Sequence, residues 1–181
     1  MTGDVFYREV KPARSPRGSI VPPGCQVETV DGRQELRIPA DVTHVETPIV
    51  FPGFTVVIEG DELSIDGPTI VDAALAAEGL EAPNTTLTTP KEVEVIGLLR
   101  VKSVRARIVR GARIEAHDID AGVSTRAAEA IVARNVTVRD GAIRAPQLVA
   151  AEVSGGNAAE SHVTWTDALA QGLLPEWLRG S

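Results

Sequence analysis

The chain has 181 residues, enough for one domain with tails or for two very small domains. Hydrophobic residues make up 43%, so a buried core is expected, but aromatic residues make up only 3%, which excludes a core built on large aromatic anchors. The formal net charge of −7 argues against general nucleic-acid binding.

The N-terminus carries no apolar signal segment, and no apolar run approaches the roughly 18 residues of a membrane-spanning helix. The single cysteine, Cys25, excludes an intrachain disulfide and fits a reducing compartment. These features predict a cytoplasmic protein.

Residues 1–18 are predicted to form a flexible basic arm. They are rich in Arg, Lys, Pro and Ser and have no periodicity. Phe6, Tyr7 and four bases would suit docking on a neighbour or contact with an anionic membrane, although a plain disordered tail is the simpler alternative.

Residues 19–90 form an acidic region with signals for β-strands. Asp31-Gly32 predicts a hairpin turn, and the stretches 55–58 and 63–65 are rich in β-branched and aliphatic residues. Residues 69–79 fit either a helix or a strand, and we favour a strand because the following sequence is repetitive. The region is either the first part of that repeat or a separate small β unit.

Within residues 91–156, aliphatic residues recur every five positions. The first series is Leu99, Val104, Val109, Ile114 and Ile119, and a small or aliphatic residue follows each of them two positions later. After a break near Ser124 the pattern resumes in the pairs Ile131/Ala133, Val136/Val138, Gly141/Ile143, Pro146/Leu148 and Ala151/Val153.

A step of five matches neither a helical face nor one long strand. It matches short strands joined by bends, so we predict an all-β fold, a parallel β-helix (solenoid) in which each coil needs its neighbours to bury its apolar side. Three faces would give roughly 15 to 18 residues per coil and four about 20, and the sequence leaves both open.

Residues 157–181 are predicted to be a linker followed by a short helix. Thr166-Asp167 would cap the helix, and Pro175 would end it. Its apolar residues include Trp165, Leu169, Leu173 and Trp177. This tail is expected either to close the open end of the solenoid or to bind a protein partner.

Residues 114–156 read IEAHDIDAGVSTRAAEAIVARNVTVRDGAIRAPQLVAAEVSGG. With its short Val/Ile/Ala alternations broken by Gly, the stretch 92–156 resembles bactofilins, the bacterial polymer-forming cytoskeletal proteins. The resemblance implies a right-handed parallel β-helix that polymerises end to end without a nucleotide, sometimes at the membrane through its N-terminal tail. The five-residue step also resembles pentapeptide-repeat proteins, whose usual Asp/Asn and Leu positions are mostly missing here.

No motif in the sequence indicates a catalytic, cofactor or metal site. His44, His117 and His162 are far apart, and the common phosphate, dinucleotide and serine-nucleophile motifs are absent. The cluster His117-Asp118-Ile119-Asp120 could bind a metal or act in acid–base chemistry, but a solvated corner is favoured.

Residues 100–113 contain six basic residues and no acidic residue. The bases are Arg100, Lys102, Arg105, Arg107, Arg110 and Arg113. Outward residues of successive units are expected to align, which predicts a basic stripe. With no aromatic residue to stack on bases, the stripe is expected to meet carboxylates of the acidic region or of a neighbouring subunit.

The sequence therefore predicts a non-enzymatic structural or scaffold protein that self-assembles through the solenoid ends and charged flanks, like a cytoskeletal protein. One alternative is a capped solenoid that binds a protein partner. Another is a β-helix acyltransferase, although its six-residue steps and glycines are missing.

Overall fold

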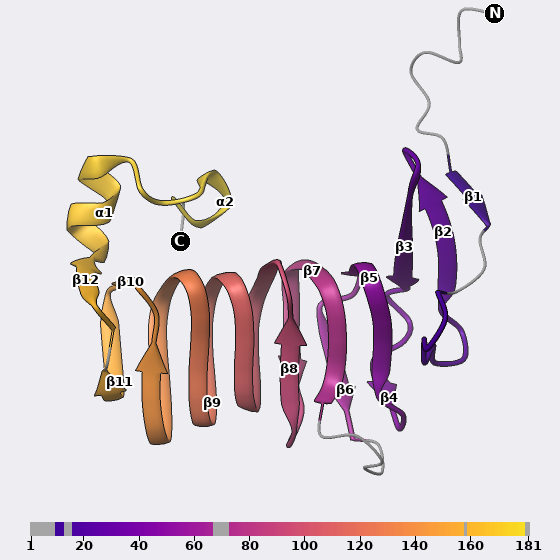
Figure 1. Ribbon diagram of the computed structural model, residues 1–181, viewed down its shortest axis with the longest axis horizontal. Coiled ribbons are helices and arrows are strands. Elements are labelled where there is room, and N and C mark those ends of the chain that lie inside the picture. Colours follow the sequence, from indigo (N-terminus) through magenta and orange to yellow (C-terminus); the bar gives the residue numbers. More distant parts are fainter. Residues whose placement is uncertain (1–9, 13–15, 67–72, 158, 180–181) are drawn as a thin grey trace, which may run out of the picture.

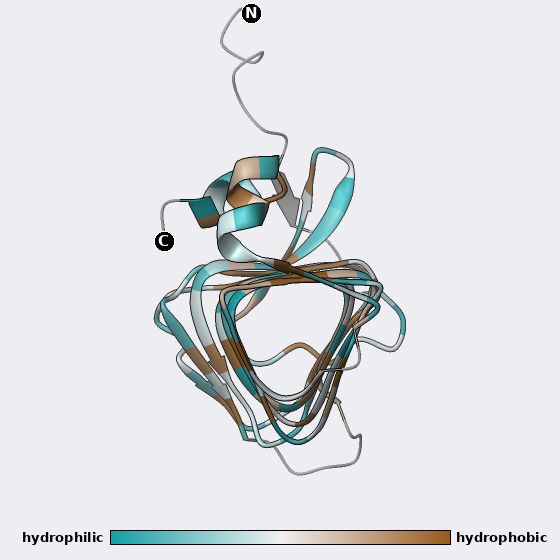
Figure 2. Ribbon diagram, turned by 90° about the vertical axis from the view of Figure 1, so that its left-hand side faces the viewer, coloured by the Kyte–Doolittle hydropathy of each residue, from teal (hydrophilic) through white to brown (hydrophobic). Residues whose placement is uncertain are grey.

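The computed structural model of the protein describes residues 10–12, 16–66, 73–157 and 159–179. Its strands belong to a single twelve-stranded sheet that winds into a β-solenoid of about seven turns, followed by two short helices (Figure 1). Viewed along its length, the solenoid has a triangular cross-section (Figure 2). The predicted all-β solenoid with a short helical tail is confirmed.

The described strands are, in chain order, β1 (Val10–Pro12), β2 (Gln26–Val30), β3 (Arg33–Ile38), β4 (His44–Val45), β5 (Ile49–Ile58), β6 (Glu62–Ile65), β7 (Ala73–Thr88), β8 (Glu92–Val95), β9 (Leu98–Arg144), β10 (Gln147–Ala150), β11 (Glu152–Asn157) and β12 (Ser161–Thr164). The helices are α1 (Trp165–Gln171) and α2 (Glu176–Arg179).

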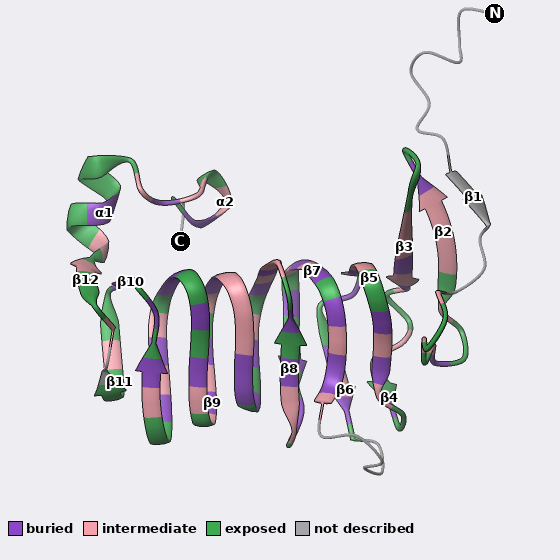
Figure 3. Ribbon diagram, in the orientation of Figure 1, coloured by how far each residue is buried: buried purple, intermediate pink, exposed green. Residues whose placement is uncertain are grey.

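The five-residue step builds the core. Its first five aliphatic positions, from Leu99 to Ile119, are at most 1% exposed. Buried and exposed positions alternate along each coil, because successive side chains of a strand point to opposite faces (Figure 3). Val93 pairs with Val109, 16 residues further on, and Ile131 with Leu148, 17 residues on. Three steps therefore complete one coil, which settles the number of faces.

The acidic region belongs to the same solenoid. β3 pairs in parallel with β5, and β5 with β7. The spacing between paired residues is 20 at Leu36 and Val56 but only 14 at Val149 and Val163, so the last coil is shorter than the first. Residues 73–79 lie in β7, as the strand interpretation predicted, whereas residues 69–72 lie outside the described residues.

The predicted pairs are only half right after Val138. Their second members Ile143 and Leu148 are buried and Val153 packs against the core, as predicted. The first members Gly141, Pro146 and Ala151 are exposed, and Ala145 and Ala150 are buried in their place. The corner around Gly141 holds extra residues that shift the pattern. A Cβ at Gly141 would overlap the carbonyl oxygen of Val123, so this corner depends on glycine.

At the N-terminal end, β2 and β3 form the predicted hairpin. Asp31 and Gly32 both have positive φ (51° and 78°), as a type I′ turn requires. β1 pairs with β2, so the prediction of an unstructured arm is wrong for Val10–Pro12. Phe6 and Tyr7, with the rest of residues 1–9 and residues 13–15, lie outside the described residues, and so does the predicted membrane contact of the arm.

The C-terminal helix begins and ends earlier than predicted. The hydroxyl of Thr164, and not of Thr166, accepts a hydrogen bond from the backbone N–H of Asp167 (3.2 Å). α1 ends at Gly172, which adopts the left-handed conformation (φ 70°), before Pro175 is reached. A second helical turn, α2, then brings the chain back above the solenoid (Figure 1).

Candidate functional site

The six bases between Arg100 and Arg113 do not form one stripe. The register places Arg100, Arg105 and Arg110 on three different faces of the solenoid, and the other three bases follow the same winding path. The predicted alignment is wrong because steps of five residues advance around a coil, whereas aligned positions are a whole coil apart.

Carboxylates pair with four of these bases, three of them across neighbouring coils and the fourth, Arg113, within its own coil. Arg100 contacts Glu81 (2.9 Å) and Glu115 (3.2 Å), Arg107 contacts Glu92 (2.6 Å), Arg113 contacts Glu115 (2.7 Å), and Arg105 lies 3.7 Å from Asp120. Glu81 comes from the acidic region, so part of the expected charge complementarity lies within the molecule. The more exposed of these pairs, such as Arg105 with Asp120, stabilise little.

The C-terminal tail (residues 165–179) lies along the outside of one face, which we call the tail face (Figure 1). The register aligns the outward side chains of Val132, Val149 and Val163 on the last three coils of this face. Val132 and Val149 are buried beneath Leu174 and Leu178. An outer surface of the solenoid is therefore apolar, and the tail is its cover.

The predicted tail residues take different positions. Trp165, Leu173 and Trp177 pack at the margin of this apolar cluster, whereas Leu169 is 51% exposed. The tail lies beside the end of the solenoid and not across it (Figure 2). The expected closure of the C-terminal end is therefore not made by any described residue.

Glu115 links the tail to the solenoid. Its side chain is buried, and its carboxylate accepts hydrogen bonds from Arg113 (2.7 Å), Arg100 (3.2 Å) and the indole Nε1 of Trp177 (2.9 Å). Burial alone would raise the pKa of this carboxyl, but the hydrogen bonds outweigh burial and hold the pKa below its ordinary value. Glu115 is therefore an ionised anchor for the tail.

His117 belongs to the same junction. Its ring meets the ring of Trp177 edge-on, with centroids 5.4 Å apart. Burial lowers the pKa of His117. The charge of Asp118 opposes this shift, and the charges of Lys102 and Arg134 add to it. A neutral imidazole is thus favoured beside the indole.

The other acids of the His117 cluster point elsewhere. Asp118 accepts a hydrogen bond from Asn135 (2.7 Å), and Asp120 pairs with Arg139 (2.7 Å). Across the described ranges, no group of three or more His, Cys, Asp or Glu side chains could hold a metal ion. Ser64, His44 and Asp66 lie together but do not form a catalytic triad. His44 contacts Asp66 (2.7 Å), and Ser64 donates to the same carboxylate (3.3 Å). In a triad the serine hydroxyl would instead be bonded to the imidazole that activates it.

The tail face was missed at the sequence level, although the sequence contains its signal. In Ile131-Val132-Ala133 and Leu148-Val149-Ala150 three apolar residues stand in a row. In a strand with one face in solvent, the middle residue of such a triplet points outward and is usually polar. An apolar middle residue therefore marks an outer face that something covers.

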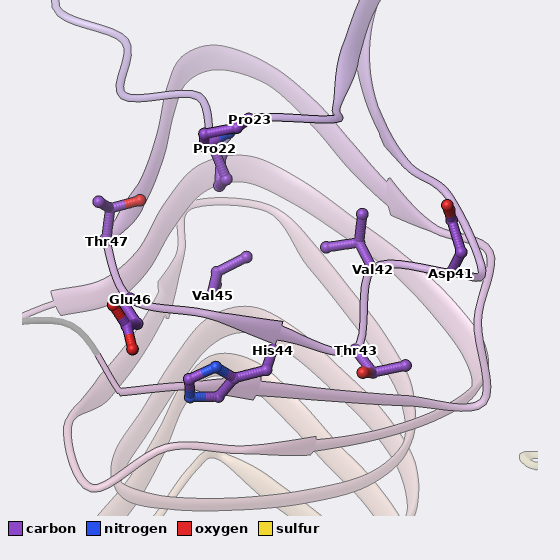
Figure 4. Close-up of a pocket in the computed structure, with 9 residues that line it drawn as sticks. All are labelled: Pro22, Pro23, Asp41, Val42, Thr43, His44, Val45, Glu46 and Thr47. Carbon is purple, nitrogen blue, oxygen red and sulfur yellow. The ribbon is translucent and has the colours of Figure 1, made fainter.

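The N-terminal end contains a second surface that the sequence did not indicate, which we call the N-terminal mouth. It is a cavity of about 570 Å³ lined by Pro22, Pro23 and residues 41–47 (Figure 4). The side chains of Val42 and Val45 point into it, and Asp41 and Glu46 lie towards its two sides (Figure 4). Nearby, burial and the charge of Asp41 raise the pKa of the Cys25 thiol, which disfavours a reactive thiolate.

The C-terminal end presents a third surface, the C-terminal edge, formed by the outer edges of β11 and β12. The N–H of Ala151 donates to Arg134 (2.9 Å) and that of Glu160 to Ala145 (3.0 Å), so both point into the solenoid. Because backbone groups alternate along a strand, those of Ser154 and Ser161 point outward. Within the described part of the chain, no strand pairs with these edges.

No protein-family model matches the chain, and comparisons with curated proteins and with solved structures find no match. Within the described ranges, neither helix is long and apolar enough to cross a bilayer. The functional argument therefore rests on three surfaces: the tail face, the N-terminal mouth and the C-terminal edge.

Proposed function

We propose that this chain is a non-enzymatic structural protein that self-associates through the C-terminal edge. One observation carries the proposal. The tail that would be expected to cover this end lies on the flank, and two strand edges have no partner among the described strands. Unpaired strand edges are templates for pairing with another chain.

The two ends of the solenoid differ. At the N-terminal end, β2 and β1 cover the edge of β3, and Ile20 bridges Val50 with two backbone hydrogen bonds (2.8 and 3.0 Å). Among the described strands at this end, only the short strands β1 and β4 keep an outer edge. A filament needs two complementary ends, whereas one open end favours a closed pair of copies related by a two-fold axis.

The size of the end limits the strength of such a pair. Strands of four or five residues at about 3.3 Å per residue give each side of the triangle a length of only about 15 Å. Contact between two such ends buries less than the roughly 1,200–2,000 Å² of a standard stable interface. We therefore expect a weak pair, populated at micromolar to millimolar concentration.

Acidic side chains moderate this association. Glu152 and Glu160 are exposed on the last coil, and a two-fold axis would bring both sets of carboxylates to the same contact. Like charges at an edge oppose pairing. Salt, which screens exposed charges over a Debye length of about 10 Å at 0.1 M, should therefore strengthen the pair.

Sedimentation velocity over a wide concentration range tests the proposal. We expect a monomer–dimer equilibrium that E152Q/E160Q tightens and that S154P, which removes an outward N–H of the edge, weakens. The double variant E78Q/E94Q, which makes the same charge change at exposed positions away from both ends, should behave as wild type.

Two results would contradict the proposal. A chain that stays monomeric at millimolar concentration in high salt would exclude self-association. Filaments in electron micrographs would exclude the closed pair and would favour the end-to-end polymer that the bactofilin resemblance implies.

A further inference from the structure

We propose that the N-terminal mouth binds an extended basic segment of a partner protein, which adds as a strand to β4. This inference is independent of self-association, because the mouth and the C-terminal edge lie at opposite ends of the solenoid (Figure 1). It assigns the chain a second role, that of a peptide-binding module.

The backbone of β4 is paired on one side only. The carbonyls of Thr43 and Val45 accept hydrogen bonds from Ser64 (2.9 Å) and Asp66 (3.0 Å) of the next coil. Alternation along the strand then directs the N–H and C=O of His44 towards the mouth. No described strand pairs with this side. An incoming strand would find a donor and an acceptor there, which is the basis of β-strand addition.

The chain's own segment at the mouth does not fill this edge. Pro22 and Pro23 form a wall of the cavity, and proline has no N–H with which to continue a β-ladder (Figure 4). A cavity of about 570 Å³ is within the range of ligand sites. The site is therefore a slot between a proline wall and an unpaired strand edge.

The lining selects the chemistry of the segment. Val42 and Val45 offer apolar contacts to side chains on one face of an added strand. Asp41 and Glu46 lie on two sides of the slot, and neither forms an ion pair with another described residue. Between residues 28 and 94 the sequence holds fourteen acids and three bases, so the half of the solenoid that carries the mouth is rich in acids. An extended segment in which Lys or Arg alternates with apolar residues complements this arrangement.

Fluorescence anisotropy with a labelled peptide of alternating lysine and valine tests the inference on the full chain. We expect saturable binding, and we expect D41N/E46Q to weaken it about threefold to thirtyfold, as the loss of two exposed ion pairs would. The matched double variant E78Q/E94Q should bind as wild type. A version of the peptide that is N-methylated at alternate residues keeps its charge and side chains but cannot pair with β4, and it should bind at least tenfold more weakly.

Several results would overturn the inference. Equal binding of the N-methylated and unmodified peptides would mean that charge alone attracts the peptide. Equal losses in D41N/E46Q and E78Q/E94Q would place the contact elsewhere, and an absence of binding at millimolar peptide would exclude the site. The sedimentation experiment is unaffected by any of these results.

Discussion

Replacing Glu115 is expected to release the C-terminal tail while the solenoid stays folded. The carboxylate of Glu115 joins two arginines of the solenoid to the indole of Trp177, and its side chain is only 5% exposed. The core columns of the solenoid do not depend on these bonds, since they are formed by inward-facing aliphatic residues. The loss should therefore fall on the tail.

The magnitude follows from the exposure of the partners. Breaking a fully buried ion pair costs about 3–5 kcal/mol, and an exposed pair contributes at most about 1 kcal/mol. The side chains of Arg100 and Arg113 keep 29% and 34% exposure, so water can solvate them once Glu115 is gone. We expect E115Q, which can still accept from Trp177, to cost about 1–2 kcal/mol. E115A, which also loses the indole bond, should cost about 2–3 kcal/mol.

Tryptophan fluorescence measures this release directly. Both tryptophans of the chain, Trp165 and Trp177, lie in the tail, whereas far-ultraviolet circular dichroism reports the strands. In urea titrations of E115A, the emission should change at lower urea than the dichroism. If both signals of E115A coincide with those of wild type to within about 0.5 kcal/mol, the anchoring argument is refuted.

Acid should remove the same anchor without a mutation. The folded-state pKa of Glu115 is depressed, so its contribution is complete above the ordinary value of 4.5 and is lost as pH falls through the folded pKa. The folded-state pKa of His117 is lowered as well, so the docked tail disfavours its protonation. Docking of the tail should therefore weaken as pH falls below the ordinary pKa of 6.5, before Glu115 is protonated. The tryptophan fluorescence of the tail should thus change in two steps on acidification, and E115Q should lack the step at lower pH.

Two further variants test the tail face and the corner glycine. Deleting residues 165–181 should uncover Val132 and Val149, giving binding of a hydrophobic dye and flank-to-flank association; unchanged dye fluorescence would contradict the assignment of the tail as a cover. G141A should cost about 2–3 kcal/mol in thermal or urea unfolding, because the backbone at Val123 must move to admit the methyl group; a wild-type midpoint would contradict that corner geometry.

The sequence predicts the local part of this fold well. The alternation of a strand assigns inward and outward positions without knowledge of distant residues, so the buried positions from Leu99 to Ile119 were predicted correctly. The Asp31-Gly32 turn was also accessible, because positive φ at two successive residues restricts the residue types that fit.

The register between neighbouring coils was harder to predict from the sequence. It depends on how many residues each corner holds, and an extra residue at one corner, such as that of Gly141, moves every later residue relative to its neighbours. The bases around Arg105 were therefore assigned to one stripe although they occupy three faces. The N-terminal mouth has no local signal, because it forms where Pro22 and Pro23 approach a segment some twenty residues away.

The shortening of the coils has a consequence for growth by stacking. Leu36 and its partner are 20 residues apart, and Val149 and its partner only 14. A repeating fibre needs subunits whose two ends have the same perimeter, so that strands continue across every junction. In this molecule the two ends differ by six residues per coil, so the corners of one end do not continue directly into those of the other. Unequal corners at the two ends thus oppose repeated end-to-end stacking.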